Sequence, residues 1–289
     1  MKFALPAALL LTLAIGCAKK ESTEPPPPAA GTVATETQAA ATAPPPPAVE
    51  AVTLPAGSPI PAAGVLLWLN ADDALASAKD GKVLSWQNAA VPNAIAKTAR
   101  EESKPPAAVA NALNGHAVVR FDGTDQMLVT TADIRPTTMP EGTVIAVFSS
   151  ATADASPLRK LYGDDDGSYD RAVGLDDRGQ GTNYTAFIGN GVAPYFPLAA
   201  NTPYITVDEF SPKEFNGWMN GKAVASKVEA NWGDDALPNM YLGGTGTVYT
   251  EYWSGDLAEI IVYARKLTDA ERTQIEDYLA KKYGVTVNR

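Results

Sequence analysis

Residues 215–226 carry the sequence Phe-Asn-Gly-Trp-Met-Asn-Gly-Lys-Ala-Val-Ala-Ser. The Asn220-Gly221 dipeptide lies between two short runs of strand-forming side chains, Phe215–Met219 and Lys222–Ser226. A two-residue type I′ turn needs a positive φ at both central residues, and Asn followed by Gly meets this need best. We therefore predict a β-hairpin here, and with it an antiparallel sheet.

Similar short apolar runs recur along the chain, separated by Gly, Asn, Asp and Pro. This pattern is typical of an all-β sandwich or barrel. The clearest further strands are expected at Val65–Leu69, Val83–Trp86, Ala117–Phe121, Met127–Thr130, Thr143–Phe148, Tyr204–Phe210 and Glu259–Tyr263.

Two segments favour helix, a weak one at Asp72–Ala78 and a strong one at Asp269–Tyr283. Thr268 and Glu271 form a capping-box pair at the start of the second, and Gly284 follows its end, where a left-handed cap is preferred. Its apolar side chains form one stripe, so we expect it to pack on the sandwich. The stripe consists of Ile275, Tyr278, Leu279 and Tyr283.

The N-terminal residues 1–16 have the features of a signal peptide. The apolar run Phe3–Ile15 follows Lys2 and is too short to cross a bilayer, which needs about 20 residues. Leu-Ala-Ile-Gly-Cys at 13–17 resembles the bacterial lipobox, with Ala14 where a leucine-like residue is usual. The resemblance implies that Cys17 is acylated and holds the chain on a lipid bilayer. The alternative is an incidental thiol after an ordinary cleaved signal.

The lipobox resemblance also implies a place in the bacterial cell envelope. Ala18 stands where an aspartate would favour the inner membrane, so we expect the outer membrane, with the protein periplasmic or surface-exposed. Residues 17–59 form a Pro/Ala/Thr-rich tether without an aromatic residue, too poor in apolar surface to fold. We expect a spacer; a proline-rich ligand or a cell-wall contact is the alternative.

All five Trp and all eleven Tyr residues fall within 60–289, which we expect to form one all-β domain. The single cysteine, Cys17, and the single histidine, His116, exclude a disulfide framework and a Cys/His zinc site. The net charge of −10, without a basic run, argues against nucleic acid as a partner.

Three stretches, at the two ends and in the middle of this domain, resemble LamG-like jelly-roll domains of the concanavalin A-like lectin/glucanase superfamily. They are Leu-Trp-Leu-Asn-Ala-Asp at 67–72 with 81–86, Asn-Ala-Leu-Asn-Gly at 111–115 with 118–123, and 255–263 with 267–272. The resemblance implies a two-sheet jelly-roll sandwich with a short C-terminal helix. It implies little about function, because such folds host unrelated activities.

The sequence lacks the catalytic strand of the laminarinase-type hydrolases in that superfamily, which has the pattern Glu-x-Asp-x-x-Glu. The nearest candidates, Asp256 and Glu259, have an odd spacing that places them on opposite faces of a strand. His116 follows the expected Asn114-Gly115 turn and has no local partners for a Ser-His triad. We therefore expect no catalytic residues and no enzyme.

Asp164, Asp166 and Asp170 belong to a dense acidic segment and could supply three oxygen ligands to calcium. The alternative is a solvated loop whose carboxylates pair with Arg171 and Arg178. Trp68 and Trp86 lie within apolar strands and are expected in the core. Four aromatic side chains near loops could stack on sugar rings, although packing is the alternative for each: Trp232, Tyr249, Tyr252 and Trp253.

Together these features predict an envelope lipoprotein whose non-catalytic LamG-like domain binds carbohydrate or an envelope or extracellular protein. Two other functions stay open, a laminarinase-like glycoside hydrolase with an unrecognised carboxylate pair and a purely structural envelope subunit.

Overall fold

A computed structural model describes residues 52, 54, 56–91, 95–99, 104–178, 183–193, 197–233, 236–246 and 251–289. The signal peptide, Cys17, nearly all of the tether and Tyr249 lie outside these residues, so what was expected of them stays a prediction. No helix within the described ranges combines the length and apolar character needed to cross a membrane.

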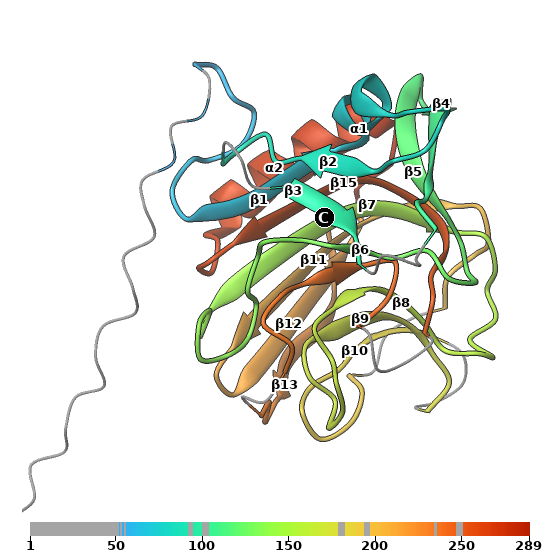
Figure 1. The fold of residues 1–289 in the computed structure, drawn as a ribbon. Coiled ribbons are helices and arrows are strands. Elements are labelled where there is room, and N and C mark those ends of the chain that lie inside the picture. The colour runs from blue at the N-terminus through green and yellow to red at the C-terminus, as the bar shows by residue number, and fades with distance from the viewer. Residues whose placement is uncertain are drawn as a thin grey trace, which may run out of the picture. The chain divides into compact units, whose positions relative to one another are not determined.

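The described elements are mostly strands (Figure 1). The strands are β1 (Val65–Asn70), β2 (Ser85–Gln87), β3 (Ile95–Thr98), β4 (Ala107–Leu113), β5 (His116–Asp122), β6 (Leu128–Val129), β7 (Gly142–Ser150), β8 (Arg159–Gly163), β9 (Ala172–Asp176), β10 (Asn183–Ala186), β11 (Pro203–Ser211), β12 (Glu214–Met219), β13 (Lys222–Glu229), β14 (Tyr241–Leu242) and β15 (Ser254–Tyr263). The helices are α1 (Ala71–Ser77) and α2 (Asp269–Tyr283).

The strands form two antiparallel sheets. The larger sheet has eight strands in the order β13-β12-β11-β7-β15-β5-β4, with β1 also paired to β15. The smaller sheet has seven strands in the order β10-β9-β8-β14-β6-β3-β2. The prediction of an all-β, two-sheet protein with a C-terminal helix is confirmed, and each expected strand overlaps an observed one.

The predicted hairpin joins β12 to β13 through Asn220 and Gly221, whose φ angles are 48° and 83°. Asn114 and Gly115 make the same turn between β4 and β5, with φ angles of 49° and 84°. His116 is therefore the first residue of a strand, and its Nδ1 lies 2.8 Å from Oδ2 of Asp72.

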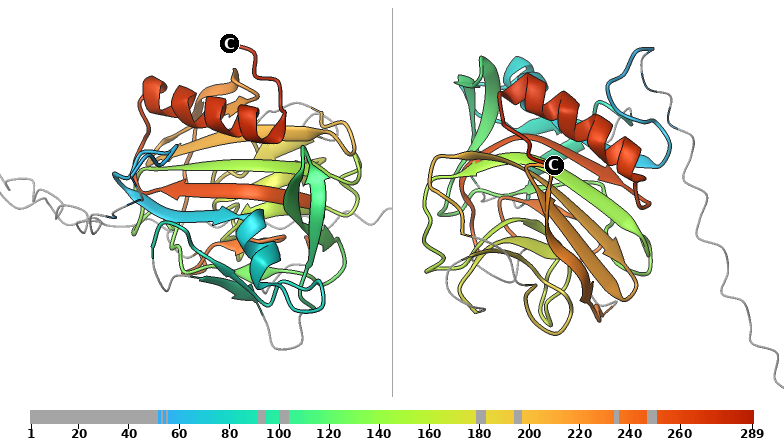
Figure 2. Two further views of the ribbon diagram at one scale, coloured as in Figure 1. Left: turned by 90° about the horizontal axis from the view of Figure 1, so that it is seen from above. Right: turned by 180° about the vertical axis from the view of Figure 1, so that it is seen from behind.

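The apolar core has two layers. One lies between the sheets and includes Trp86, Phe121 and Phe148. The other lies between the larger sheet and α2, where Ile275, Leu279 and Tyr283 are buried as predicted. Figure 2 shows α2 extended across the outer face of that sheet.

Helix α2 has the bounds and caps that its sequence predicts. The Thr268 hydroxyl and the Glu271 side chain complete the capping box, and Gly284 ends the helix at a φ of 68°. The shorter helix α1 begins after Asn70, whose side chain accepts a hydrogen bond from the Asp72 amide. Trp86 and Trp68 are both buried, as expected, the first between the sheets and the second beside α2.

Candidate functional site

A buried ion pair lies on strands β8 and β9 of the smaller sheet. The ammonium of Lys160 is 2.7 Å from Oδ2 of Asp176, and neither side chain is exposed to solvent. The Arg178 guanidinium donates to the same carboxylate, with Nη2 2.6 Å from Oδ2. Burial by itself would raise the pKa of Asp176, but the hydrogen bonds from Arg178 and the charge of Lys160 lower that pKa to about 2. Asp176 is therefore a fixed negative charge.

Two aromatic rings contact the cations of this cluster. The Lys160 ammonium lies 3.8 Å from the centroid of the Phe187 ring, and the guanidinium carbon of Arg178 lies 4.9 Å from the same centroid. The Tyr169 ring meets Phe187 edge to face at 5.1 Å and lies 5.1 Å from Arg178. Such cation–π contacts favour the charged forms and fix the orientation of the guanidinium.

Glu251 brings a second carboxyl group to the cluster. The backbone amide of Lys160 donates to the Glu251 carbonyl at 2.9 Å, and Oε1 of Glu251 lies 3.8 Å from Nη2 of Arg178. Burial raises the pKa of Glu251, although the charges of Lys160 and Arg178 oppose the shift. Its Oε2 is buried without a hydrogen-bond partner among the described residues. A carboxyl oxygen with unused hydrogen-bonding capacity is therefore held next to the arginine.

These groups enclose an open pocket of about 140 Å³, which we call the Glu251 pocket. Its lining consists of Asp165, Gly167, Ser168, Tyr169, Arg178, Phe187 and Glu251. Burial raises the pKa of the Asp165 carboxyl, although that group also accepts a hydrogen bond from the Asp170 amide at 2.9 Å. The pocket thus combines two carboxyl groups, a guanidinium and two aromatic rings.

The loop that forms one wall of the pocket has an unusual backbone. Ser168 and Tyr169 both have φ angles of 61°, in the left-handed region that residues with side chains rarely adopt. Strained residues of this kind persist where surrounding contacts hold them, and they concentrate at ligand sites. Here the second of these residues is Tyr169, whose ring lies beneath the Arg178 guanidinium.

The three residues expected to bind calcium lie next to this pocket. Asp164 and Asp170 are buried and Asp166 is half-buried, but no three His, Cys, Asp or Glu side chains of the described ranges are arranged to hold a metal ion. The carboxylate set alone therefore does not form the expected site, and calcium binding stays a prediction.

Positive charge next to Asp164 comes from Arg171, which is fully buried. Its guanidinium donates to the carbonyl oxygens of Ile134, Met139 and Pro140 at 2.7, 2.6 and 3.2 Å. Burial raises the pKa of Asp164 well above its usual value, and the charge of Arg171 opposes that shift. The arginine thus occupies carbonyl oxygens of the kind that a calcium ion would use.

The aromatic residues expected to contact sugar have different surroundings. Trp253 is fully buried in the core between the sheets, so its ring is not available for stacking, contrary to expectation. Trp232 is half-buried, and its indole donates to the Phe187 carbonyl at 3.1 Å. Tyr252 is half-buried and follows Glu251 directly, and its backbone is bridged to Lys160. Of these three, Tyr252 is next in sequence to a pocket residue.

The expectation that Asp256 and Glu259 lie on opposite faces of their strand is wrong. A β-bulge between Leu257 and Glu259 adds one residue to β15, so both carboxylates reach the outer face of the larger sheet. Asp256 pairs with Arg120 at 2.6 Å. Glu259 is buried beneath α2 and accepts hydrogen bonds at 2.6 to 3.1 Å from Trp68, Tyr278, Lys282 and Tyr283. Its carboxylate is thus occupied in holding α2.

Sequence reasoning missed three residues that line the pocket, Tyr169, Phe187 and Glu251, and Lys160, which contacts Phe187 beside it. Lys160, Tyr169, Phe187 and Glu251 come from separate segments, and only tertiary structure brings them together. One signal was available in the sequence: Tyr169 lies between Asp166 and Asp170, two of the expected calcium ligands, and Glu251 directly precedes Tyr252.

Comparisons with known proteins place the fold among solved structures. No family model and no curated protein matches the chain. A Trypanosoma rangeli sialidase in complex with the inhibitor DANA is similar over 79% of this chain and 35% of its own, with a TM-score of 0.52 and 17% identity. The same sialidase in complex with sialic acid covers the same shares, with a TM-score of 0.51 and 18% identity.

A mutant GH54 α-L-arabinofuranosidase soaked with 4-nitrophenyl α-L-arabinofuranoside is similar over 71% of this chain and 52% of its own, with a TM-score of 0.50 and 12% identity. The chain thus spans about a third of the length of the sialidase and half that of the arabinofuranosidase. At these identities the likeness shows the fold. None of the three is named for a LamG-like domain, so they do not support that resemblance.

The expectation that the protein is not an enzyme is wrong, because the sequence does not exclude enzymatic activity. It rested on the missing laminarinase-type strand, whereas the similar solved structures are those of a sialidase and an arabinofuranosidase. The absence of one family's motif therefore does not exclude glycoside hydrolysis.

Proposed function

We propose that this protein acts on carbohydrate and that the Glu251 pocket holds a sugar. The observation that carries this proposal is the lining of one pocket by two aromatic rings, a guanidinium and two carboxyl groups. The Tyr169 ring offers a face to the C–H groups of a sugar, while Arg178 donates to its hydroxyls and Asp165 and Glu251 accept from them. The free Oε2 of Glu251 supplies an acceptor that no other described residue uses.

The similar structures add support of a general kind. The sialidase is in complex with sialic acid in one of them, and the arabinofuranosidase was soaked with an arabinofuranoside in another. A two-sheet scaffold of this kind is therefore compatible with sugar chemistry. We also propose that the two sheets have the jelly-roll connectivity that the sequence resemblance implies.

Binding by the full chain tests this function. We would measure its retention by laminarin, arabinan and polygalacturonate in affinity gels, and its binding of sialyllactose by calorimetry. Glu251→Gln should weaken binding about tenfold. The carboxylate of Glu251 can accept hydrogen bonds at two oxygens, whereas the amide of glutamine can accept at only one. The variant should stay folded, since burial already disfavours the charged form of Glu251.

Glu229→Gln is the matched control, because Glu229 is exposed on β13 of the other sheet. It should bind as the unmodified protein does. If the unmodified protein binds none of the probes, or if Glu251→Gln binds all of them unchanged, the assignment of the pocket is wrong.

Hydrolysis of a glycosidic bond is the second candidate function. Asp165 and Glu251 line one pocket, and the pKa of each is raised, which favours the protonated form that a general acid needs. In this reaction one carboxyl gives its proton to the glycosidic oxygen. Water, deprotonated by the other carboxylate, then adds to the anomeric carbon as the bond breaks. Release of reducing sugar that is lost in Glu251→Gln and kept in Glu229→Gln would support it.

Anchoring at the cell envelope is a separate part of the proposal and rests on the sequence alone. Acylation of Cys17 predicts that the chain incorporates labelled palmitate in a bacterial host and partitions into detergent. The variant Cys17→Ser should incorporate no label. Equal labelling of the two proteins would contradict acylation of Cys17 and would leave the assignment of the Glu251 pocket unaffected.

A further inference from the structure

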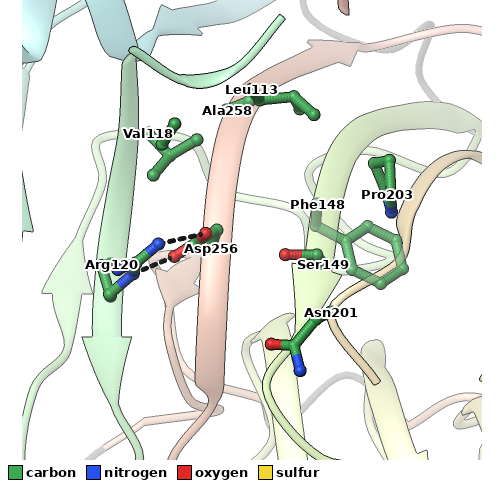
Figure 3. Close-up of a pocket in the computed structure, with 10 residues that line it drawn as sticks. Leu113, Val118, Arg120, Phe148, Ser149, Asn201, Pro203, Asp256 and Ala258 are labelled. Atoms are coloured by element: carbon green, nitrogen blue, oxygen red, sulfur yellow. Dashed lines mark hydrogen bonds and ion pairs between the residues drawn. The ribbon is translucent and has the colours of Figure 1, made fainter. Parts of the chain in front are cut away.

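A groove lies on the outer face of the larger sheet, next to the end of α2. Two adjoining depressions of about 210 and 240 Å³ share Arg120, Ser149, Asn201 and Asp256 and so form one groove (Figure 3). Ala258 also lines it, and the hydroxyl of Tyr283 on α2 donates to the Ala258 carbonyl at 3.3 Å. The groove therefore begins where the helix stops covering the sheet.

An arginine–carboxylate pair lines one side of the groove. Nε and Nη2 of Arg120 lie 2.6 and 2.8 Å from the two carboxylate oxygens of Asp256, a bidentate pair between neighbouring strands β5 and β15. Half of the Arg120 side chain is exposed (51%), against 18% for Asp256. Nη1 of Arg120 makes no hydrogen bond to another described residue, so the pair is neutral as a whole and still has a donor to offer.

Ser149 and Asn201 add further polar groups around the same space, as Figure 3 shows. Within the described ranges neither side chain makes a hydrogen bond. The backbone of Asn201 is fixed at a φ of 56°, and its amide donates to the Ser150 carbonyl at 2.6 Å. The fold thus holds the side-chain amide of Asn201 and the hydroxyl of Ser149 in place, and their hydrogen-bonding capacity is unused.

The chemistry of the groove identifies the class of ligand. Leu113, Val118 and Pro203 give it an apolar wall beside the polar groups. The Arg120–Asp256 pair has no net charge, so it offers little electrostatic attraction to a phosphate or a metal ion. A neutral sugar needs no net charge, because its hydroxyls both donate and accept and its ring offers C–H groups to the wall.

The groove is close to the Glu251 pocket along the chain. Glu251 lines the pocket and Asp256 lines the groove, and the two residues are five positions apart in the chain. At about 3.4 Å per residue these span no more than about 17 Å. A glycan of a few sugar rings can bridge such a distance.

We propose that this groove is a second subsite, which binds neutral sugar residues of the glycan that occupies the Glu251 pocket. The inference rests on the proposed carbohydrate function, and it adds a prediction of its own. Affinity rises with glycan length, because the second subsite is engaged only when the chain reaches it.

The test uses the full chain, with laminarin and arabinan as neutral probes and polygalacturonate as the charged one. The double variant Ser149→Ala/Asn201→Gly removes both free side chains, and glycine keeps the left-handed backbone that Asn201 needs. It should bind the neutral polymers about tenfold more weakly, since two hydrogen bonds are lost. Its binding of a disaccharide should be unchanged.

Asn111→Gly is the matched control, because Asn111 is an exposed asparagine with a φ of 51° outside the groove. It should bind like the unmodified protein. Ser149→Ala alone keeps the test decisive if the double variant misfolds. It should weaken binding of the neutral polymers about threefold.

The two proposals fail in different ways. If Glu251→Gln weakens binding of the neutral polymers and the double variant does not, the groove is not a subsite and the pocket assignment stands. If the protein binds only polygalacturonate, the neutral ligand class is wrong. If it binds no glycan, both proposals fall.

Discussion

The ammonium of Lys160 and the carboxylate of Asp176 form an ion pair 2.7 Å apart in which neither side chain reaches solvent. Strands β8 and β9 bring the two residues together, and Arg178 completes the set of donors to Asp176. Removing one partner of such a pair leaves an uncompensated charge in the interior, which costs far more than the pair itself contributes.

Asp176→Asn should therefore lower the free energy of unfolding by about 3–5 kcal/mol, because it leaves the buried Lys160 without a counter-charge. Urea unfolding at pH 7 measures the change. Asp177→Asn is the control, since Asp177 is the exposed neighbour, and it should change stability by less than about 0.5 kcal/mol. Equal effects of the two variants would contradict the buried pair.

Acid should weaken the protein through the same carboxylate. The pKa of Asp176 is lowered to about 2, so its contribution is fully present above the unfolded value of about 3.9 and is lost as the pH falls through about 2. Linkage gives about 2.5 kcal/mol for this group. The stability difference between the unmodified protein and Asp176→Asn should be constant above about pH 5 and should shrink by most of that amount at pH 2. A difference independent of pH would show that the charge is not responsible.

Arg171→Met should lower the free energy of unfolding by about 3–5 kcal/mol. The change removes the donor to two buried carbonyl oxygens and one partly buried carbonyl oxygen, and it removes the positive charge next to Asp164. Adding Asp164→Asn to that variant should recover part of the loss, because the uncompensated carboxylate is then gone. Thermal and urea unfolding of both single variants and the double variant form the required cycle. Strictly additive losses would show that the two residues do not interact.

The two Asn-Gly turns provide a matched pair. Gly221→Ala and Gly115→Ala each place a side chain at a positive φ, of 83° and 84°, which costs about 1 kcal/mol. The added methyl at Gly221 would also lie 3.1 Å from the Asn288 carbonyl oxygen, whereas nothing lies within 4 Å at Gly115. Gly221→Ala should therefore be the more destabilising in urea unfolding. The opposite order would mean that the C-terminal residues do not pack on the hairpin.

Much of the fold was predictable because its signals are local. The bounds of α2 follow from Thr268, Glu271 and Gly284, which lie within a few residues of the backbone groups that they cap. The hairpin at Asn220-Gly221 follows from two adjacent φ angles. The same dipeptide at 114–115 had the same meaning.

The site was less predictable, because it depends on contacts between distant segments. The bulge in β15 moves Glu259 to the face that carries Asp256, and no dipeptide marks that extra residue. Trp253 follows loop residues in sequence, yet the Phe148 ring meets it edge to face in the core. The Glu251 pocket joins residues from 165 to 251, so hydrophobic periodicity could not assemble it.

Two edge strands of the larger sheet, β4 and β13, have one feature in common. Strand β4 carries Asn111 at a φ of 51° within a break in its pairing, and β13 carries Lys227 at the same φ beside its own register shift. A straight edge strand would offer an unbroken row of amide and carbonyl groups to any passing chain. In β4 and β13 these rows are interrupted, so a second copy of this domain is hindered from extending the sheet through either strand.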